Sequence, residues 1–294
     1  MLDTLLADAW NYHADESERL AVELERASDE AEDRNLDPLL HLAAHTMGEH
    51  LGDWPRARRL AEQVIAGRAP SRETARAWSR LGVVRMMTGD LAGGVAADLV
   101  AVSVAENPLA TMLEARFMLI DALVGARSAE AVAGVYTGAL ALARRLGDAA
   151  PHRIIAVASN NLASELVEAK SRTPAEDALM ATAAEAAHAF WMKIGTWVQD
   201  ERARYLRALV ANALGKPAEA LAQADAALAI IAANGDQPVD TVFLTLARSR
   251  SLRLLGETAD SAAALAAADA AAAAWDDQGL KDWYAEERAR AWPE

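Results

Sequence analysis

The chain has 294 residues, of which 53% are hydrophobic and only 5% aromatic, and its formal net charge is −14. This acidic balance argues against nonspecific nucleic-acid binding. The absence of cysteine excludes disulfides, thiolate metal sites and cysteine nucleophiles. No uncharged apolar run reaches the roughly 18 residues of a membrane span, and Asp3 and Asp8 stand where a signal peptide would carry basic residues. We therefore expect a soluble cytoplasmic protein with no membrane contact.

Apolar residues recur at helical spacing along the whole chain, and no stretch alternates for long enough to predict a sheet. Seven helix pairs are predicted, at about residues 2–33, 38–66, 72–106, 109–146, 152–194, 197–233 and 239–275. Turn signals mark them at Gly52-Asp53, Gly89-Asp90, Gly147-Asp148, Ser171–Pro174, Gly215–Pro217 and Gly256-Glu257. Residues 279–291 are predicted to form a capping helix over the apolar face of the last pair. The whole chain, 1–294, then forms one all-α repeat domain.

The third pair carries the most specific pattern. It opens W-x-x-L-G at Trp78, turns at Gly89-Asp90 and ends at Asn107-Pro108, and its glycine at position 82 lets a neighbouring helix approach closely. If Gly94 is taken as position 20 of this repeat, steps of 37 residues reach Ala57 and Leu20 in one direction and Ala131 in the other. A constant period of this kind indicates stacked helix pairs.

This pattern resembles the tetratricopeptide repeat (TPR), and the resemblance covers nearly the whole chain. It implies a right-handed α-solenoid with a concave groove. The repeats here are longer than the 34 residues of that family, and such long repeats resemble those of bacterial regulators and signal-sensing proteins. Arg85 and Asp98 depart from the pattern, which has tyrosine and phenylalanine at these positions.

The resemblance also places one face of each first helix on the groove. The polar residues projected there are Arg76, Ser79, Arg116, Asn160, Ser164, Arg202, Tyr205, Asn212, Arg250 and Arg253, with Phe243 and Leu246 among the apolar ones. Arginine pairs with carboxylates and asparagine bonds an extended backbone, so this face suits a peptide with acidic or C-terminal carboxylate groups. Alternatively, the arginines pair with the chain's own surplus acids.

Motifs for catalysis or metal binding are weak. His41, His45 and Glu49 are spaced four residues apart, with His50 adjacent, but the spacing matches no zinc-protease motif, and His45 occupies a position where the repeat carries a small residue. Glu185 and His188 form a single E-x-x-H, where a di-iron bundle needs two. Nucleophile-elbow, dinucleotide and phosphate-loop motifs are absent from the sequence. We expect no metal, no cofactor and no catalytic residue.

The tryptophans are mostly interpreted as core residues, and a functional aromatic cage is the alternative. The function that these features favour is a non-enzymatic scaffold that binds a protein or peptide in the concave groove. A ligand-sensing regulator that changes shape on binding a small molecule or signalling peptide is the alternative, and self-association is compatible with either. An enzyme would need titratable groups that converge in a closed pocket, and the projected face shows few.

Overall fold

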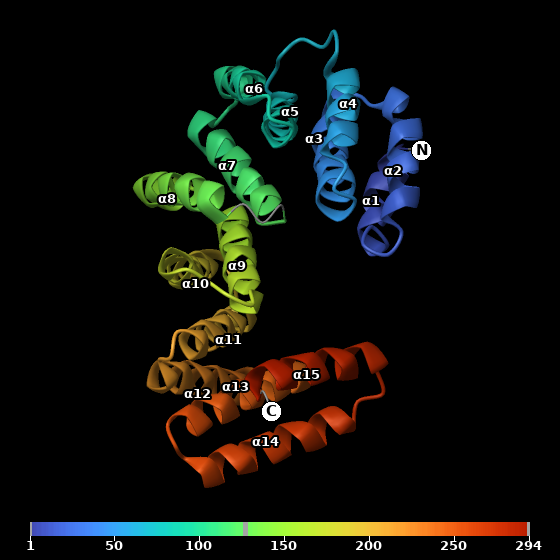
Figure 1. Ribbon diagram of the computed structural model, residues 1–294. Helices are drawn as coiled ribbons and strands as arrows, with labels where there is room; N and C mark the ends of the chain where they lie inside the picture. The colour runs from blue at the N-terminus through green and yellow to red at the C-terminus, as the bar shows by residue number, and fades with distance from the viewer. Residues whose placement is uncertain (1, 126–128, 293–294) are drawn as a thin grey trace. The chain divides into compact units, whose positions relative to one another are not determined.

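The protein is described by a computed structural model covering residues 2–125 and 129–292 (Figure 1). Over these residues the structure has fifteen α-helices, three 3₁₀ turns, one π-helix and no strand. The all-α class predicted from the periodicity is confirmed, as is the packing of the helices in consecutive pairs. The chain divides into two compact units, Met1–Ile154 and Ile155–Glu294, which we call the N-terminal and C-terminal units and describe separately.

The N-terminal unit contains the first four predicted pairs. Its helices are α1 (Leu2–Asp8), α2 (Ser17–Ala27), α3 (Asp33–Ala43), the π-helix η3 (Ala44–His50), α4 (Trp54–Ile65), α5 (Ala75–Met87), α6 (Leu91–Val104), α7 (Pro108–Gly125) and α8 (Ala129–Leu146). The 3₁₀ turns are η1 (Ala9–Asn11), η2 (Ser28–Glu30) and η4 (Gly147–Ala149). A leucine- and alanine-rich core joins α1 to α5, and it includes the fully buried Leu20, Leu36 and Met47.

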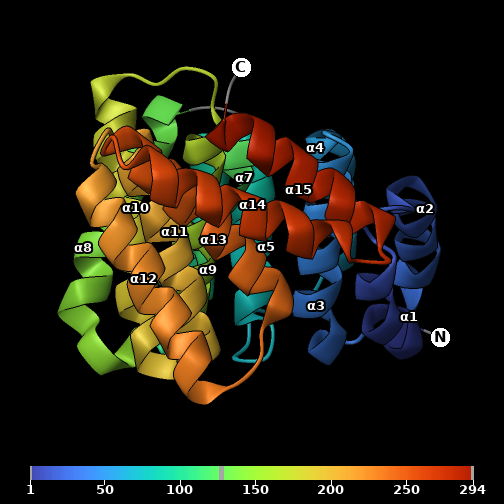
Figure 2. The same cartoon turned by 90° about the horizontal axis from the view of Figure 1, so that it is seen from below.

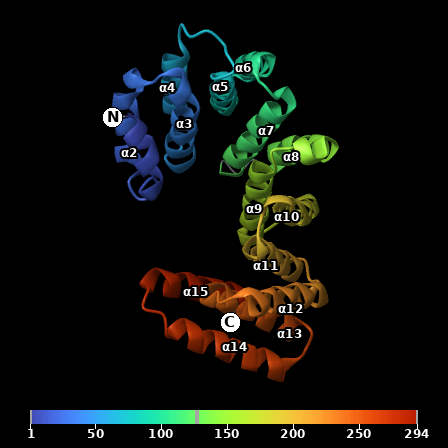
Figure 3. The same cartoon turned by 180° about the vertical axis from the view of Figure 1, so that it is seen from behind.

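The C-terminal unit contains nearly all of α9 (His152–Glu168), which begins just before it, and all later helices (Figure 3). These are α10 (Pro174–Ile194), α11 (Trp197–Ala213), α12 (Pro217–Asn234), α13 (Pro238–Leu254), α14 (Thr258–Ala273) and α15 (Gln278–Ala291).

Glycines in the left-handed region make the predicted turns. Gly52, Gly89, Gly215 and Gly256 have φ between +68° and +85°, a conformation that other L-residues rarely adopt. At the turn after Gly89, the Asp90 side chain accepts a hydrogen bond from the Gly93 backbone N–H at 2.9 Å and so caps the start of α6. Each turn reverses the chain and lets the second helix of a pair pack against the first.

Small residues lie where the two helices of a pair cross. Between α5 and α6, a Cβ atom added at Gly82 would lie 2.6 Å from Asp98 Oδ1 and 3.1 Å from the Gly94 carbonyl oxygen. The close approach predicted at Gly82 is therefore confirmed.

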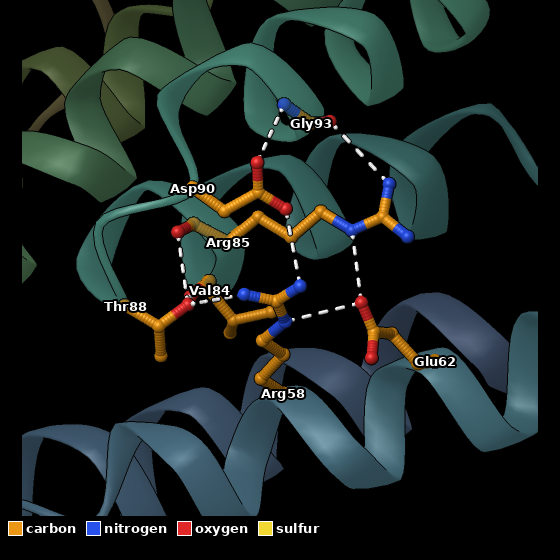
Figure 4. A network of polar contacts seen from close by, with 7 residues as sticks. All are labelled: Arg58, Glu62, Val84, Arg85, Thr88, Asp90 and Gly93. Carbon is orange, nitrogen blue, oxygen red and sulfur yellow. Dashed lines mark hydrogen bonds and ion pairs between the residues drawn. The ribbon is translucent and has the colours of Figure 1, made fainter.

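Arg85 belongs to a polar network between α4, α5 and α6 (Figure 4). Its Nε donates to Glu62 of α4 at 3.1 Å, and its Nη1 donates to the Gly93 carbonyl at 3.4 Å. Arg58 donates to the same Glu62, to Thr88 and to Asp90, each at 3.1 Å. These hydrogen bonds join the first helix of the third pair to the second helix of the pair before it.

The last helix, α15, packs along α13 and α14 and covers their apolar faces, as predicted (Figure 2). Tyr284 is buried among Phe243, Leu246 and Ala268, and its hydroxyl donates to Asp269 at 2.7 Å. Arg288 forms an ion pair with the same carboxylate at 2.7 Å. Among the described residues, no helix is both long and apolar enough to cross a membrane.

The second pair departs from the predicted geometry because its first helix ends as a π-helix, η3. His45 occupies the repeat position that Gly82 fills in α5, where a large side chain has no room. The wider π turn leaves the His45 side chain 27% exposed and brings Gly48 against the Trp54 ring, which a Cβ atom would meet at 2.5 Å. Gly48 thus serves as the small residue of this crossing.

Candidate ligand-binding groove in the C-terminal unit

Two adjoining pockets form a groove along one face of α9, α11 and α13, and α15 contributes to its wall. One pocket has a volume of about 610 Å³ and the other about 330 Å³. They share the side chains of Tyr205, Leu209 and Phe243, so the two are continuous across an apolar floor. We call them the acidic pocket and the basic pocket, after the charges described below.

Aromatic rings line the acidic pocket. Phe243 of α13 is buried, and its ring centroid lies 4.1 Å from that of Trp283 of α15, with an angle of 36° between the planes. Trp283 is nevertheless 45% exposed, because its indole stands at the pocket mouth. Tyr205 of α11 completes this wall, and burial raises the pKa of its hydroxyl far above the usual value. A large apolar ring left open at a pocket mouth is available to a ligand.

An unusual carboxylate lies at the base of the acidic pocket. Glu201 is 0% exposed, and neither of its carboxylate oxygens accepts a hydrogen bond from any donor in the described part of the chain. Burial, and after it the neighbouring Asp240 carboxylate, raise its pKa to about 8. Both effects favour the protonated form of Glu201, whose O–H can be shared with Asp240.

Arg202 of α11 holds Asp240 of α13 in place. Its Nη2 lies 3.0 Å from Asp240 Oδ2, while the Arg202 Nε atom is 3.6 Å from Glu201. The pocket thus contains two carboxyl groups and one guanidinium. Because that guanidinium is already paired, the pocket offers acceptors and aromatic surface, not a free positive charge.

The second pocket has the opposite balance. Its lining includes the four basic residues Lys170, Arg172, Arg250 and Arg290 and the two acidic residues Glu168 and Glu287. Most of these charges are paired. Arg172 bonds Asp177 at 2.7 Å, and Arg290 lies 3.4 Å from Glu168 and 3.1 Å from Glu287.

Arg250 and the exposed Lys170 are the exceptions. Among the described residues Arg250 has no ion-pair or hydrogen-bond partner, although it is part-buried on the pocket wall. Burial, followed by the nearby charges of Arg253 and Arg172, lowers its pKa. A guanidinium that is partly desolvated and without a partner is a strong site for a carboxylate.

Several residues projected onto the groove from the sequence line these pockets. Asn160, Ser164, Arg202 and Tyr205 line the acidic pocket, Arg250 lines the basic pocket, and Tyr205 lies in both. Phe243 and Leu246 lie on the same surface. The repeat register therefore brings side chains from three first helices onto one surface.

Two other projected residues of this unit have structural contacts instead. Asn212 is 3% exposed; its amide donates to the Ala247 carbonyl at 3.2 Å and accepts from Ser251 at 3.1 Å. These bonds join α11 to α13. Arg253 donates to the Ala291 carbonyl at 3.0 Å, and its guanidinium lies 4.4 Å from the Trp292 ring centroid. It thereby holds the C-terminal end of α15.

The remaining projected residues lie in the N-terminal unit. Arg76 forms two hydrogen bonds with Glu114, at 2.9 and 3.0 Å, and Arg116 bonds the buried Asp98 at 2.5 Å. Ser79 is 4% exposed and faces the interior. Like Arg202, these two arginines are paired with the chain's own acids, which is the alternative that the acidic composition suggested.

The sequence interpretation missed the contribution of α15 and the buried acid. Trp283, Glu287 and Arg290 were assigned only to a cap, because nothing local shows that the cap also lines the groove. For Glu201 a signal was present. It precedes the buried Ala208 by seven residues and Asn212 by eleven, so it falls on the buried stripe of α11. An acid on that stripe indicates a functional or strained position.

The histidine of the E-x-x-H motif makes structural contacts. His188 of the E-x-x-H lies 2.8 Å from Asp200, and its second ring nitrogen lies 3.2 Å from Arg207. His188 therefore links α10 to α11.

No protein-family model matches this chain, and no curated protein sequence matches it at a significant level. The groove geometry is therefore the basis for a functional conclusion.

Proposed function

We propose that this chain is a TPR-like, right-handed α-solenoid whose groove in the C-terminal unit binds a peptide or an extended protein segment, without catalysis. One observation carries the proposal. The unpaired Arg250 and the buried Glu201 lie in two pockets joined by the apolar floor of Tyr205, Leu209 and Phe243. The cytoplasmic location favoured by the sequence is part of this proposal.

The charge arrangement favours a particular ligand chemistry. A carboxylate, either acidic or C-terminal, would pair with Arg250, as expected from the sequence. An apolar side chain would rest on Phe243, and a donor such as an amine or amide would reach Asp240 and Glu201 beside the Trp283 ring. A segment with an anionic end and a donor a few residues before it matches both pockets.

Helix packing supports tight binding at low entropic cost. The groove residues belong to the α-helices α9, α11, α13 and α15, and buried contacts such as Asn212–Ala247 and Tyr284–Asp269 hold these helices together. Side chains already fixed in position lose little freedom when a ligand binds. The mechanism is therefore preorganisation.

The test is a screen of the full chain with a peptide library carrying free C-terminal carboxylates, followed by calorimetry on the peptides retained. Amidation of the C-terminus and Arg250→Gln should each weaken binding by about 1.5–3 kcal/mol, the usual value of a hydrogen bond to a charged group. This corresponds to roughly a tenfold to hundredfold rise in Kd. Added salt should weaken wild-type binding in the same direction.

Arg248→Gln is the matched control. Arg248 lies on the same helix, but its guanidinium is paired with Asp225 at 2.7 Å and it does not line either pocket. This variant should bind as the wild type does. Equal binding by Arg250→Gln and wild type would show that the carboxylate of the peptide does not bind at Arg250.

A small ligand is the second candidate, and Glu201 favours it. A buried carboxyl group that receives no hydrogen bond, beside two aromatic rings in a pocket of about 610 Å³, could accept a compact amine. Thermal-shift screening with a metabolite collection would distinguish the two. Stabilisation by amines that Trp283→Ala abolishes, with no peptide retained, would select the sensor function.

A further inference from the structure

Three histidines from distant parts of the N-terminal unit converge on one point. His13 follows the turn η1, and His45 and His50 belong to η3. One ring nitrogen of each lies within 4.8 Å of the corresponding atoms of the other two. The site belongs to a different unit from the groove and is independent of the proposed function.

The π-helix explains why His45 and His50 meet. Five residues of an α-helix turn a side chain well away from the starting face, whereas the i→i+5 bonding of a π-helix returns it to that face. The Leu51 N–H donates to the Thr46 carbonyl at 3.1 Å, a bond of this type. The Nε2 atoms of His45 and His50 consequently lie 3.1 Å apart.

In two of the imidazoles, the Nδ1 atom already forms a hydrogen bond. His45 Nδ1 lies 2.5 Å from the Glu49 carboxylate, and His13 Nδ1 lies 2.9 Å from the Trp10 carbonyl oxygen. Both partners are acceptors, so each Nδ1 carries the proton and each Nε2 is left for another ligand. Metal-binding histidines have this outer arrangement, a ring N–H donated to a carboxylate or a backbone carbonyl.

We propose that His13, His45 and His50 form a binding site for a divalent transition-metal ion of the zinc class. Imidazole nitrogens are preferred ligands of Zn²⁺, at about 2.0–2.1 Å, and the edge of such a tetrahedron is about 3.3 Å. The observed 3.1 Å between the His45 and His50 nitrogens is close to this edge. With Nδ1 of His45 protonated, its Nε2 can face that of His50 only with a proton or a cation between them.

The ion would connect two segments that are distant in the sequence. His13 lies between η1 and α2, while His45 and His50 belong to η3, so three-histidine ligation would join the turn before α2 to the π-helix. The fourth tetrahedral position is left for water or a small anion. The ring of Trp10 covers one side of the cluster, with its centroid 5.1 Å from His13 and 5.4 Å from His45.

The experiment uses the full chain without a purification tag, first treated with a chelator. Calorimetric titration with ZnCl₂ should show one tight site per chain. Titration with CoCl₂ should give the intense visible bands of a tetrahedral Co²⁺ site. Zn²⁺ should also raise the Tm, because it binds the folded chain only.

Variants assign the ligands. His13→Ala, His45→Ala and His50→Ala should each abolish the tetrahedral Co²⁺ bands and the rise in Tm. Glu49→Gln should retain the bands but weaken Zn²⁺ binding by roughly tenfold to a hundredfold, the usual loss for an outer-shell partner. His152→Ala, which removes an imidazole outside the cluster, should behave as the wild type. Circular dichroism of each metal-free variant establishes that it is folded.

Two results would overturn the site. One is Zn²⁺ binding by His13→Ala as tight as in the wild type. This result would show that His13 is not a ligand and that the ion binds only the His45–His50 pair. The other is the absence of stoichiometric binding in the folded wild type, which would mean that the His45–His50 contact holds only a proton.

Discussion

Gly82 and Gly94 bring α5 and α6 so close together that a Cβ atom added at Gly94 would lie 2.9 Å from the carbonyl oxygen of Gly82. The corresponding crossings of later pairs also use small residues. Ala208 and Ala220 are both fully buried between α11 and α12. At the α13–α14 crossing, Ser249 and Ser261 exchange hydroxyl-to-carbonyl hydrogen bonds of 3.0 and 2.8 Å. The two helices of a pair thus approach closely in each of these crossings, although the small residues that allow it differ.

Replacing Gly82 with leucine tests this packing. The side chain would meet Asp98 and the backbone of α6, so Gly82→Leu should lower the free energy of unfolding by about 1–3 kcal/mol through overpacking. Urea denaturation followed by circular dichroism measures the change. Gly138→Leu is the control, because Gly138 is also within a helix but has nothing within 4 Å of its Cβ position. That control should be neutral or slightly stabilising, since leucine favours a helix over glycine. Equal stability of the two variants would contradict the observed crossing.

Loss of the Arg116 charge should destabilise the N-terminal unit. Arg116 forms the ion pair with Asp98 in the described part of the chain, and Asp98 is 6% exposed with one oxygen already lacking a hydrogen bond. Arg116→Gln should cost somewhat less than the roughly 3–5 kcal/mol seen for fully buried pairs, because Arg116 itself is part-exposed. Arg76→Gln, which breaks the more exposed pair with Glu114, should cost only about 0–1 kcal/mol.

The pH dependence separates these effects. Burial raises the pKa of Asp98, although Arg116 opposes this. Without Arg116 the carboxyl should protonate more readily in the folded state, so the cost of Arg116→Gln should shrink as the pH falls. Urea denaturation across acidic and neutral pH measures this trend. A cost that is independent of pH would indicate lost packing and not an unpaired carboxylate.

Glu201 should make stability fall as pH rises. Its pKa is about 8 in the folded protein and near its ordinary value of 4.5 when unfolded. Between these values the folded state holds the extra proton, so the free energy of unfolding decreases with pH by at most about 1.4 kcal/mol per unit. Below about pH 4.5 the carboxyl group is protonated in both the folded and the unfolded state, so it adds no pH dependence to the free energy of unfolding.

Glu201→Gln should remove this slope, because an amide keeps the donor to Asp240 and does not ionise. The difference in unfolding free energy between variant and wild type should therefore grow in favour of the variant from about pH 4.5 to about pH 8. Parallel wild-type and Glu201→Gln curves would show that Glu201 is ionised throughout.

Deleting residues 279–294 should promote self-association. The deletion removes Tyr284 and exposes the faces of Phe243, Leu246 and Ala268. Apolar surface of this kind is normally covered in a monomeric protein. Light scattering coupled to gel filtration measures the mass. As a control, Arg288→Ala breaks the ion pair to Asp269 but leaves α15 in place, and its mass should equal that of the wild type. A truncated chain as monodisperse and stable as the full chain would contradict the capping role.

The sequence was sufficient for features that depend on neighbours along the chain. Helical spacing, Gly-x turns such as Gly89-Asp90, and the 37-residue step from Ala57 to Gly94 predicted the helix pairs, because these signals act within one or two turns. The same register placed Asn160, Ser164, Arg202 and Tyr205 on one face. Residues at one repeat position share a face once the repeats stack.

Other features depend on contacts between distant residues, and only the tertiary structure decided them. His50 meets His45 because η3 adopts a π-helix, and no local preference for that geometry is visible in the sequence. Trp283 becomes a groove residue because α15 folds back along α13. The raised pKa of Glu201 depends on burial and on Asp240, which is 39 residues away in the sequence. Burial and charge proximity are properties of the packed molecule, so a linear pattern does not specify them.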